Sequence, residues 1–89
     1  MISYLTDDFI RLFSFLPENV KKLSRKAYNL WKTTPFHPSL QFKQIHSSEP
    51  IWSVRIGIKW RALALKEENK VYWFWIGSHY DYDKYINQL

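Results

Sequence analysis

A histidine stands where an aromatic strand is predicted to end, near the C-terminus of the chain. Residues 70–85 read KVYWFWIGSHYDYDKY, so an apolar and aromatic run leads directly into Gly77, Ser78 and His79. Small α+β domains often place reactive side chains at such a point, because the sheet fixes the geometry while the adjoining loop stays open to substrate. An imidazole can act as acid or base near neutral pH, which makes His79 the first catalytic candidate. A histidine that only begins a helix would show the same pattern.

Two arginines upstream of this histidine could stabilise an anion. Arg61 begins the preceding predicted strand, and its planar guanidinium suits bidentate contact with a phosphate. Arg55 alternates with apolar residues on the strand before that, so it lies on the solvent-facing side and could flank the same phosphate. Each has a simpler interpretation. Arg61 could pair with a carboxylate or cover an aromatic ring, and Arg55 could only solubilise an open sheet face.

Tyr82 and Asp83 follow the histidine at helical spacing. If a helix begins at His79, Tyr82 and Asp83 lie three and four positions further on, on the same side of that helix as His79. Asp83 could then orient the imidazole, although it could equally be an exposed surface carboxylate. Tyr82 could stack on a base or donate a proton, but its spacing with the later apolar residues also indicates partial burial.

Other familiar chemistries lack their residues. His37 and His46 are separated by eight residues, which is no recognised metal-ligand spacing, and the chain has no cysteine to assist them. Ser78 and His79 are adjacent, so in a strand they point to opposite faces and cannot form a nucleophile and base pair. With only two glycines the chain has no phosphate-binding glycine loop. The sequence therefore predicts neither a metal nor a cofactor.

Two helices are predicted to precede the strands that carry the arginines. Thr6 is a suitable N-cap and is followed by two aspartates, after which apolar residues recur at helical spacing up to Leu16. Pro17 suits the first turn of a second helix, which continues to Thr33 before Pro35 ends it. This second helix has two pairs of like charges four residues apart, Lys21 with Arg25 and Lys22 with Lys26. An anionic partner or plain solvent could balance them.

The second half of the chain predicts a sheet and a final helix. Residues 35–50 hold three of the four prolines and no periodicity, so they predict an extended crossover. Alternation and turn residues predict three strands in succession, at residues 52–58, 61–66 and 71–77, with a tight bend at residues 59 and 60. Ser78 and Asp81 have capping-box spacing and open a last helix. The predicted fold is α+β, with two N-terminal helices packed on a small antiparallel sheet, a three-stranded meander, and a short C-terminal helix.

Composition indicates one small basic domain. The chain has 89 residues and a formal net charge of +5, and one core of this size makes a single domain, residues 1–89. Residues 18–34 hold five basic and one acidic residue, and residues 51–70 hold five basic and two acidic ones. These clusters favour a polyanion or an acidic protein as partner. No cysteine, no signal-like N-terminus and no apolar run near about 18 residues are present, which predicts a soluble, cytoplasmic protein.

The order of these elements and their residues resemble the RelE/ParE superfamily of toxins from bacterial type II toxin-antitoxin systems. The resemblance covers nearly the whole chain and rests on three segments: Leu16 and Pro17 with Val20, residues 52–56 with 60–63, and residues 75–79. It implies a RelE-like mRNA interferase, a toxin that cleaves mRNA, typically at the ribosome, while a small acidic antitoxin wraps it and blocks its site. ParE-like relatives instead poison DNA gyrase. Only Met1 to Leu5 precede the first helix, so the strand that usually begins this fold is short or missing.

The resemblance also implies a mechanism and its residues. Ribonuclease members use no metal: a base removes the ribose 2′-hydroxyl proton, cations stabilise the pentacoordinate phosphate, and an acid protonates the 5′-oxygen. Arg61 matches the arginine of the family's strand motif, and His79 matches the histidine that some members carry after the last strand. We therefore predict Arg61, His79 and Arg55 as catalytic residues.

Further positions are predicted around this centre. Lys43, Lys59 and Tyr82 are expected along the RNA path, and Asp83 is expected to orient His79. The alternative is a non-enzymatic binding protein, either a gyrase-directed toxin or an inactive member of the superfamily that binds only its antitoxin.

Overall fold

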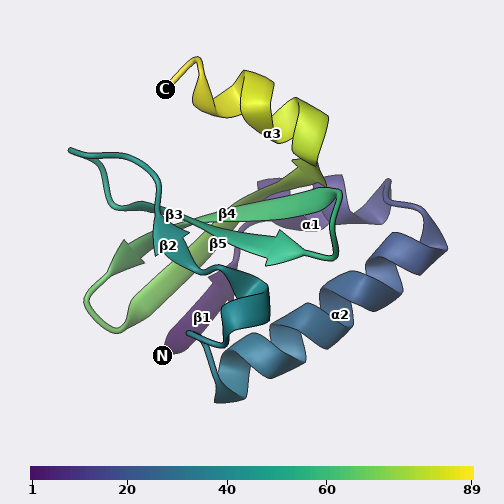
Figure 1. Ribbon diagram of the computed structural model, residues 1–89, viewed down its shortest axis with the longest axis horizontal. Coiled ribbons are helices and arrows are strands. Elements are labelled where there is room, and N and C mark those ends of the chain that lie inside the picture. Colours follow the sequence, from purple (N-terminus) through teal and green to yellow (C-terminus); the bar gives the residue numbers. More distant parts are fainter.

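Five strands and three α-helices make up the computed structural model, which describes residues 1–89 (Figure 1). Their order along the chain is β1 (Ile2–Leu5), α1 (Asp7–Ser14), α2 (Glu18–Thr33), the 3₁₀ helix η1 (Pro38–Leu40), β2 (Lys43–Gln44), β3 (Ile51–Ile56), β4 (Trp60–Glu67), β5 (Lys70–Ser78) and α3 (His79–Ile86). The helices α1 and α2 pack on one face of the sheet, and α3 packs alone on the other. The α+β class predicted from the sequence is confirmed.

Both predicted helix caps are present. The Thr6 hydroxyl accepts a hydrogen bond from the Phe9 amide at 3.2 Å, which begins α1. The Ser78 hydroxyl accepts one from the Asp81 amide at 3.1 Å, which begins α3 at His79. The last helix therefore starts where β5 ends, and His79 lies at that junction.

The sheet is mixed, with the strand order β1-β5-β4-β3-β2. The strands β3, β4 and β5 form the predicted antiparallel meander. In contrast, β1 runs parallel to β5, from Ile2 opposite Lys70 to Leu5 opposite Trp73. The usual first strand of this fold is thus short but present, and it makes the sheet mixed where we predicted an antiparallel one. A strand of four residues shows too little alternation for its sequence to reveal a partner or a direction.

Two local predictions are wrong. The segment 35–50 is not simply extended, because it contains η1 and then β2, which pairs with β3. The strand predicted over residues 52–58 ends at Ile56, and Trp60 belongs to β4 rather than to the bend. Gly57 adopts a φ of +60°, a left-handed conformation that favours glycine, and so begins the turn two residues earlier than predicted. Ile58 is consequently exposed in the turn.

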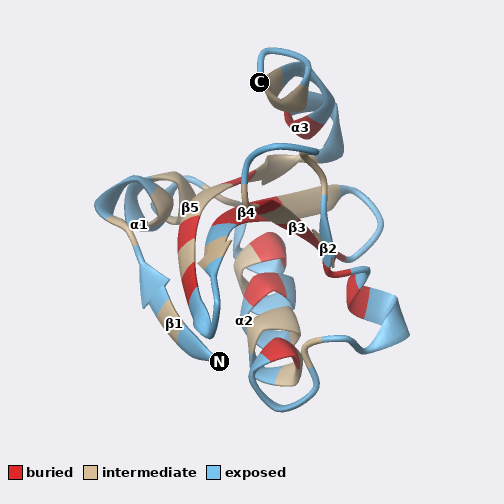
Figure 2. Cartoon of the chain, turned by 90° about the vertical axis from the view of Figure 1, so that its left-hand side faces the viewer, coloured by how far each residue is buried: buried red, intermediate tan, exposed pale blue.

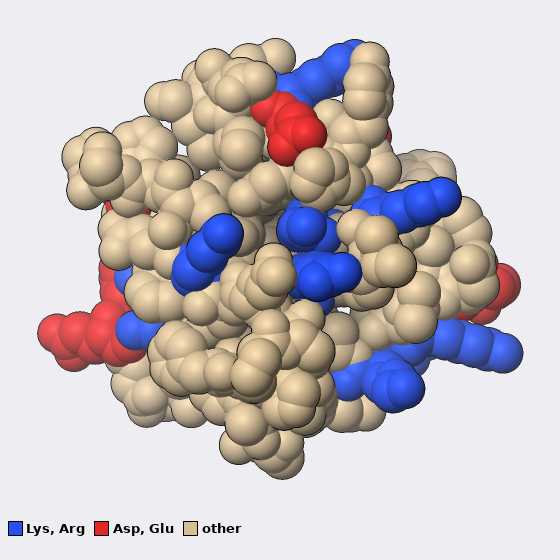
Figure 3. All heavy atoms as spheres, viewed as in Figure 1, with Lys and Arg blue, Asp and Glu red and all other residues tan.

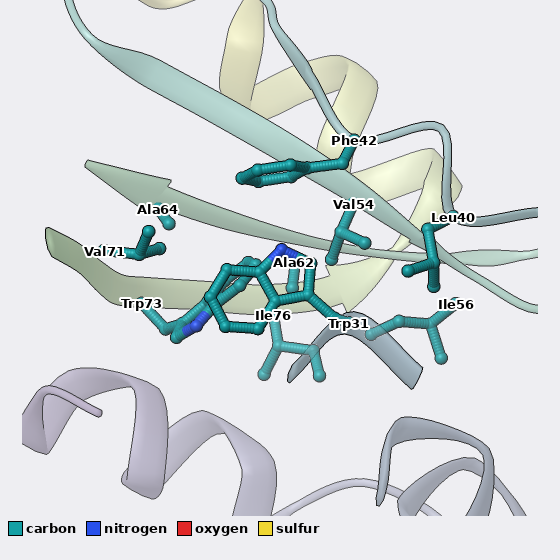
Figure 4. Packing of buried hydrophobic residues seen from close by; sticks show 10 residues of the cluster. All are labelled: Trp31, Leu40, Phe42, Val54, Ile56, Ala62, Ala64, Val71, Trp73 and Ile76. Atoms are coloured by element: carbon teal, nitrogen blue, oxygen red, sulfur yellow. The ribbon is translucent and has the colours of Figure 1, made fainter. Parts of the chain in front are cut away.

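The main core lies between the sheet and the helices α1 and α2 (Figure 4). Its buried side chains are Trp31, Leu40, Phe42, Val54, Ile56, Ala62, Ala64, Val71, Trp73 and Ile76. Trp31 and Phe42 meet nearly edge to face, with their ring planes at 83°. The buried indole N–H of Trp31 has no oxygen or nitrogen acceptor, and Figure 4 shows this nitrogen on the edge of the ring toward Phe42.

The opposite face of the sheet is only partly covered. Ile51, Leu63 and Tyr82 form a small second cluster between the sheet and α3. Figure 2 shows α3 standing over one end of the sheet with most of its own surface exposed. The same face remains open beside the turn between β3 and β4, where the predicted site residues lie. No helix of the structure combines the length and the apolar character that crossing a membrane requires.

Candidate active site

Two arginines lie side by side on the open face of the sheet. Arg55 of β3 is the register partner of Arg61 of β4, and Arg61 is in turn opposite Gly77 of β5. Residues directly opposite in an antiparallel pair have Cβ atoms about 5 Å apart. Arg55 Nε donates to the Gly57 carbonyl at 2.9 Å, and Arg61 Nη1 donates to the Trp60 carbonyl at 2.9 Å. A guanidinium has five N–H donors, so each side chain keeps donors for a further ligand.

The surroundings of Arg61 disfavour its charge. Partial burial lowers the pKa of Arg61 and the charge of Arg55 lowers it further, whereas Tyr82 and Asp83 raise it. An arginine nevertheless stays protonated at every physiological pH, so the lowered pKa reflects the cost of keeping a cation at this position. The ion pairs of the molecule involve neither arginine. A bound anion would therefore be favoured here.

The backbone of His79 is hydrogen-bonded to the turn that follows β3. Its amide donates to the Lys59 carbonyl at 2.6 Å. Its Nδ1 lies 3.3 Å from Asp83 Oδ2, one helical turn further on, and the two side chains are 48% and 54% exposed. A carboxylate beside Nδ1 favours a proton on that nitrogen. The contact that an orienting role of Asp83 requires is present.

Tyr82 lies among the candidate residues but is buried. Its ring centre is 6.0 Å from the guanidinium carbon of Arg61 and 5.9 Å from the ring centre of His79. The side chain is only 8% exposed, so little of its ring is open for stacking on a base. The geometry favours a positioning role, in which the aromatic face holds the Arg61 cation.

The two predicted lysines border the arginine pair. Lys43 of β2 is opposite Ser53, two residues before Arg55 and on the same face of β3. Lys59 lies in the turn between β3 and β4, and both lysines are exposed. Figure 3 shows Lys and Arg side chains gathered in the middle of this side of the molecule, with few acidic side chains among them. The structure thus brings all the sequence-predicted residues to one end of the sheet and to the first turns of α3.

Gly77 and Trp75 are two contributors that the sequence analysis missed. A Cβ added to Gly77 would lie 2.7 Å from Cζ2 and Cη2 of Trp75, so the indole occupies the space above the glycine. Because Gly77 is opposite Arg61, the indole lies next to the arginine and under α3, where its ring centre is 6.5 Å from that of Tyr82. The sequence feature that could have identified them is their spacing: a tryptophan and a glycine two residues apart in a strand lie on the same face.

The remaining histidines stabilise their own loops. Nδ1 of His37 accepts a hydrogen bond from the Ser39 amide at 3.2 Å, and Nδ1 of His46 accepts one from the Glu49 amide at 3.0 Å. No group of three or more His, Cys, Asp or Glu side chains is arranged to hold a metal ion.

The fold is similar to that of solved bacterial and archaeal toxins at low sequence identity. The chain is similar over 92% of its length, and over 96% of that chain, to the RelB-RelE antitoxin-toxin complex of Methanococcus jannaschii, with a TM-score of 0.73 and 11% identity. A copper-bound mutant toxin from Helicobacter pylori gives a TM-score of 0.62 at 18% identity over 91% of this chain and 97% of that one. The conserved hypothetical protein HP0892 from Helicobacter pylori gives 0.60 at 16% identity over 92% and 98%.

The family follows from the sequence itself. Residues 18–84 match the family model of the ParE-like toxin domain. The chain therefore belongs to this family, and with it to the RelE/ParE superfamily of toxins from toxin-antitoxin systems, as the resemblance predicted. No curated protein sequence matches the chain.

Proposed function

We propose that this toxin is a metal-independent endoribonuclease that cleaves mRNA. The observation that carries the proposal is the pair of adjacent cations, Arg55 and Arg61, without a carboxylate partner and next to the imidazole of His79. Like charges directly opposite in a sheet destabilise the fold by about 0.2–1 kcal/mol. A phosphate between the two guanidiniums would turn this repulsion into attraction.

In the proposed reaction, the ribose 2′-oxygen attacks the neighbouring phosphorus while the bond from phosphorus to the 5′-oxygen breaks. Solvent takes the proton of the 2′-hydroxyl. Arg61 and Arg55 contact the non-bridging oxygens, where negative charge accumulates in the pentacoordinate state. His79 donates a proton from Nε2 to the departing 5′-oxygen, with Asp83 holding the other side of the ring. The products are a 2′,3′-cyclic phosphate and a 5′-hydroxyl.

The deciding experiment incubates purified protein with mRNA, with and without ribosomes, in the presence of EDTA. We expect cleavage by the wild type, none by Arg61→Ala, and a rate about 10²–10⁴-fold lower for His79→Ala. The control variant is Lys66→Ala, which removes a cation whose Nζ donates to the Glu68 carbonyl at 2.9 Å, at the other end of β4. Absence of cleavage in every condition rules out the nuclease. Loss of cleavage on adding EDTA rules out the metal-free mechanism.

An acidic antitoxin is the proposed protein partner. One of the similar structures is an antitoxin-toxin complex. In this chain a cavity of about 370 Å³ opens between α1, α2 and the sheet, and twelve of its fourteen lining residues are hydrophobic. Arg25 lines the cavity 5.4 Å from the centre of the Phe13 ring, and Lys21 lies 6.0 Å from the same ring centre. An apolar groove with a cationic rim suits an amphipathic helix with acidic flanks.

Co-expression with a small acidic protein encoded beside this gene tests the partner and its groove together. Ile10 lines the cavity, and we expect Ile10→Asp to lose capture of the antitoxin while RNA cleavage is kept. Phe15→Asp is the matched control, because Phe15 follows the same helix, is 78% exposed and does not line the cavity. Equal capture by both variants would place the antitoxin elsewhere.

The second candidate function is poisoning of DNA gyrase, because the matching family model is ParE-like. Such a toxin would inhibit supercoiling by gyrase and leave mRNA intact, so parallel assays of supercoiling and of RNA cleavage separate the two. The contact of His79 with Asp83 favours the nuclease. We place either activity in the cytoplasm, which fractionation of expressing cells tests.

A further inference from the structure

The cations of α2 point to two different sides of the helix. Lys21 and Arg25 lie toward α1, over the ring of Phe13. Lys22 and Lys26 are one helical turn apart and so share a side of α2 that is turned away from Phe13, and Lys26 also follows Leu23 by three residues. Both are exposed, and neither takes part in an ion pair. The basic run of α2 is therefore not one uniform solvated face.

The turn between β3 and β4 lies near this side of α2, although α2 packs on the other face of the sheet from the arginine pair. A methyl group built on Gly57 would lie 3.5 Å from Leu23 Cδ1, so the turn between β3 and β4 lies against Leu23, three residues before Lys26. That turn carries Lys59 and directly follows the strand of Arg55. Figure 1 shows the turn above the N-terminal half of α2, and Figure 3 shows Lys and Arg side chains from the middle of this face to α2. The two lysines thus continue the positive surface away from the arginine pair.

The chemistry of this flank suits phosphates better than a protein. Lys22 and Lys26 repel each other at the spacing of one helical turn, and nothing anionic in the molecule relieves them. Protein interfaces are centred on apolar side chains with few charges, and the apolar groove lies on the opposite flank of α2. Nucleic-acid backbones are bound by such rows of lysines. A rise of about 6 Å over four helical residues lets the two ammonium groups reach different phosphates.

We propose that Lys22 and Lys26 bind the phosphate backbone of the RNA substrate beyond the scissile phosphate. The inference rests on the proposed function, because it takes RNA as the substrate. It assigns α2 a role in affinity and none in the chemical step. RNA then crosses from the arginine pair, over the turn at Lys59, to the exposed flank of α2.

Two uncleavable RNAs of different length test whether Lys22 and Lys26 bind the phosphate backbone. Both carry 2′-O-methyl groups and the same central sequence; one is a trinucleotide that fills only the arginine site, and the other is a dodecanucleotide that reaches α2. We expect Lys22→Ala/Lys26→Ala to weaken dodecanucleotide binding about tenfold at low salt, and to reduce the slope of log affinity against log salt by about 1.4, for two phosphates at about 0.7 each. Trinucleotide binding is expected to stay unchanged. Fluorescence anisotropy measures both.

The matched control is Lys66→Ala/Lys70→Ala, which removes the same charge around the turn between β4 and β5, at the opposite end of these strands. If the α2 variant weakens both RNAs equally, or weakens the dodecanucleotide no more than the control does, the proposed track is wrong. A wild type that binds neither RNA overturns this inference together with the proposed function. A wild type that binds the dodecanucleotide but leaves unmodified mRNA intact overturns the nuclease alone.

Discussion

Arg55 and Arg61 face each other across β3 and β4, and neither forms an ion pair with a carboxylate. Folding therefore brings two cations together on an open sheet surface and partly buries one of them. The repulsion between the two arginines lowers the free energy of unfolding, and it makes binding of a phosphate between them favourable.

Arg61→Gln is expected to abolish RNA cleavage and to raise the free energy of unfolding by up to about 1 kcal/mol, because it removes the repulsion from Arg55. The pKa of Arg61 is lowered in the folded state, so the charged form is disfavoured on folding at every pH below that pKa. Because arginine titrates only at very alkaline pH, the gain should be constant from about pH 5 to pH 9. Urea denaturation at several pH values measures it. The control is Arg11→Gln, since Arg11 lies 3.6 Å from Asp8 and should show no gain.

Inorganic phosphate is expected to raise the melting temperature of the wild type more than sodium chloride of equal ionic strength does. A ligand that binds only the folded state stabilises it by about 2.7 kcal/mol at a hundred times its dissociation constant. Arg55→Gln and Arg61→Gln should each reduce the phosphate effect. Thermal unfolding followed by tryptophan fluorescence checks this, and an equal response of all three proteins would contradict a site between the arginines.

Asp83→Asn is expected to lower the single-turnover cleavage rate about tenfold without changing RNA affinity, because the amide no longer favours a proton on His79 Nδ1. His79→Ala should lower the rate further, and the double variant should be no slower than His79→Ala alone. Asp81→Asn is the control, since this carboxylate lies in the same helix and is not in contact with the imidazole. Additive losses in the double variant would show that the aspartate acts independently of the histidine.

Gly77→Ala is expected to destabilise the fold by about 1–3 kcal/mol, because its methyl group would overlap the indole of Trp75. Adding Trp75→Leu should recover part of that loss by vacating the space. Gly57→Ala should also destabilise the protein, but through its φ of +60°, so Trp75→Leu should not rescue it. Urea unfolding of the single and double variants distinguishes steric overlap from backbone strain.

Much of the fold was predictable because its signals are local. The caps at Thr6 and Ser78, the helical spacing of apolar residues and the alternation along the meander each depend on residues a few positions apart. The pairing of β1 with β5 and of β2 with β3 was not predictable, since strands of four and two residues carry almost no periodicity. The turn at Gly57 was displaced from its predicted place for a related reason, because the register with β4 decides where β3 ends.

The features of the candidate site likewise divide into those that the sequence predicted and those that only the structure revealed. The sequence by itself determined the superfamily, the residue types of the site and their side of each strand, because alternation sets which face a strand residue occupies. Only the tertiary structure decided that Arg55 is opposite Arg61, that Tyr82 is buried beside them, and that Leu23 of α2 lies next to the turn at Gly57. Those relationships come from hydrogen-bond register and core packing between residues far apart in the chain, which no local pattern encodes.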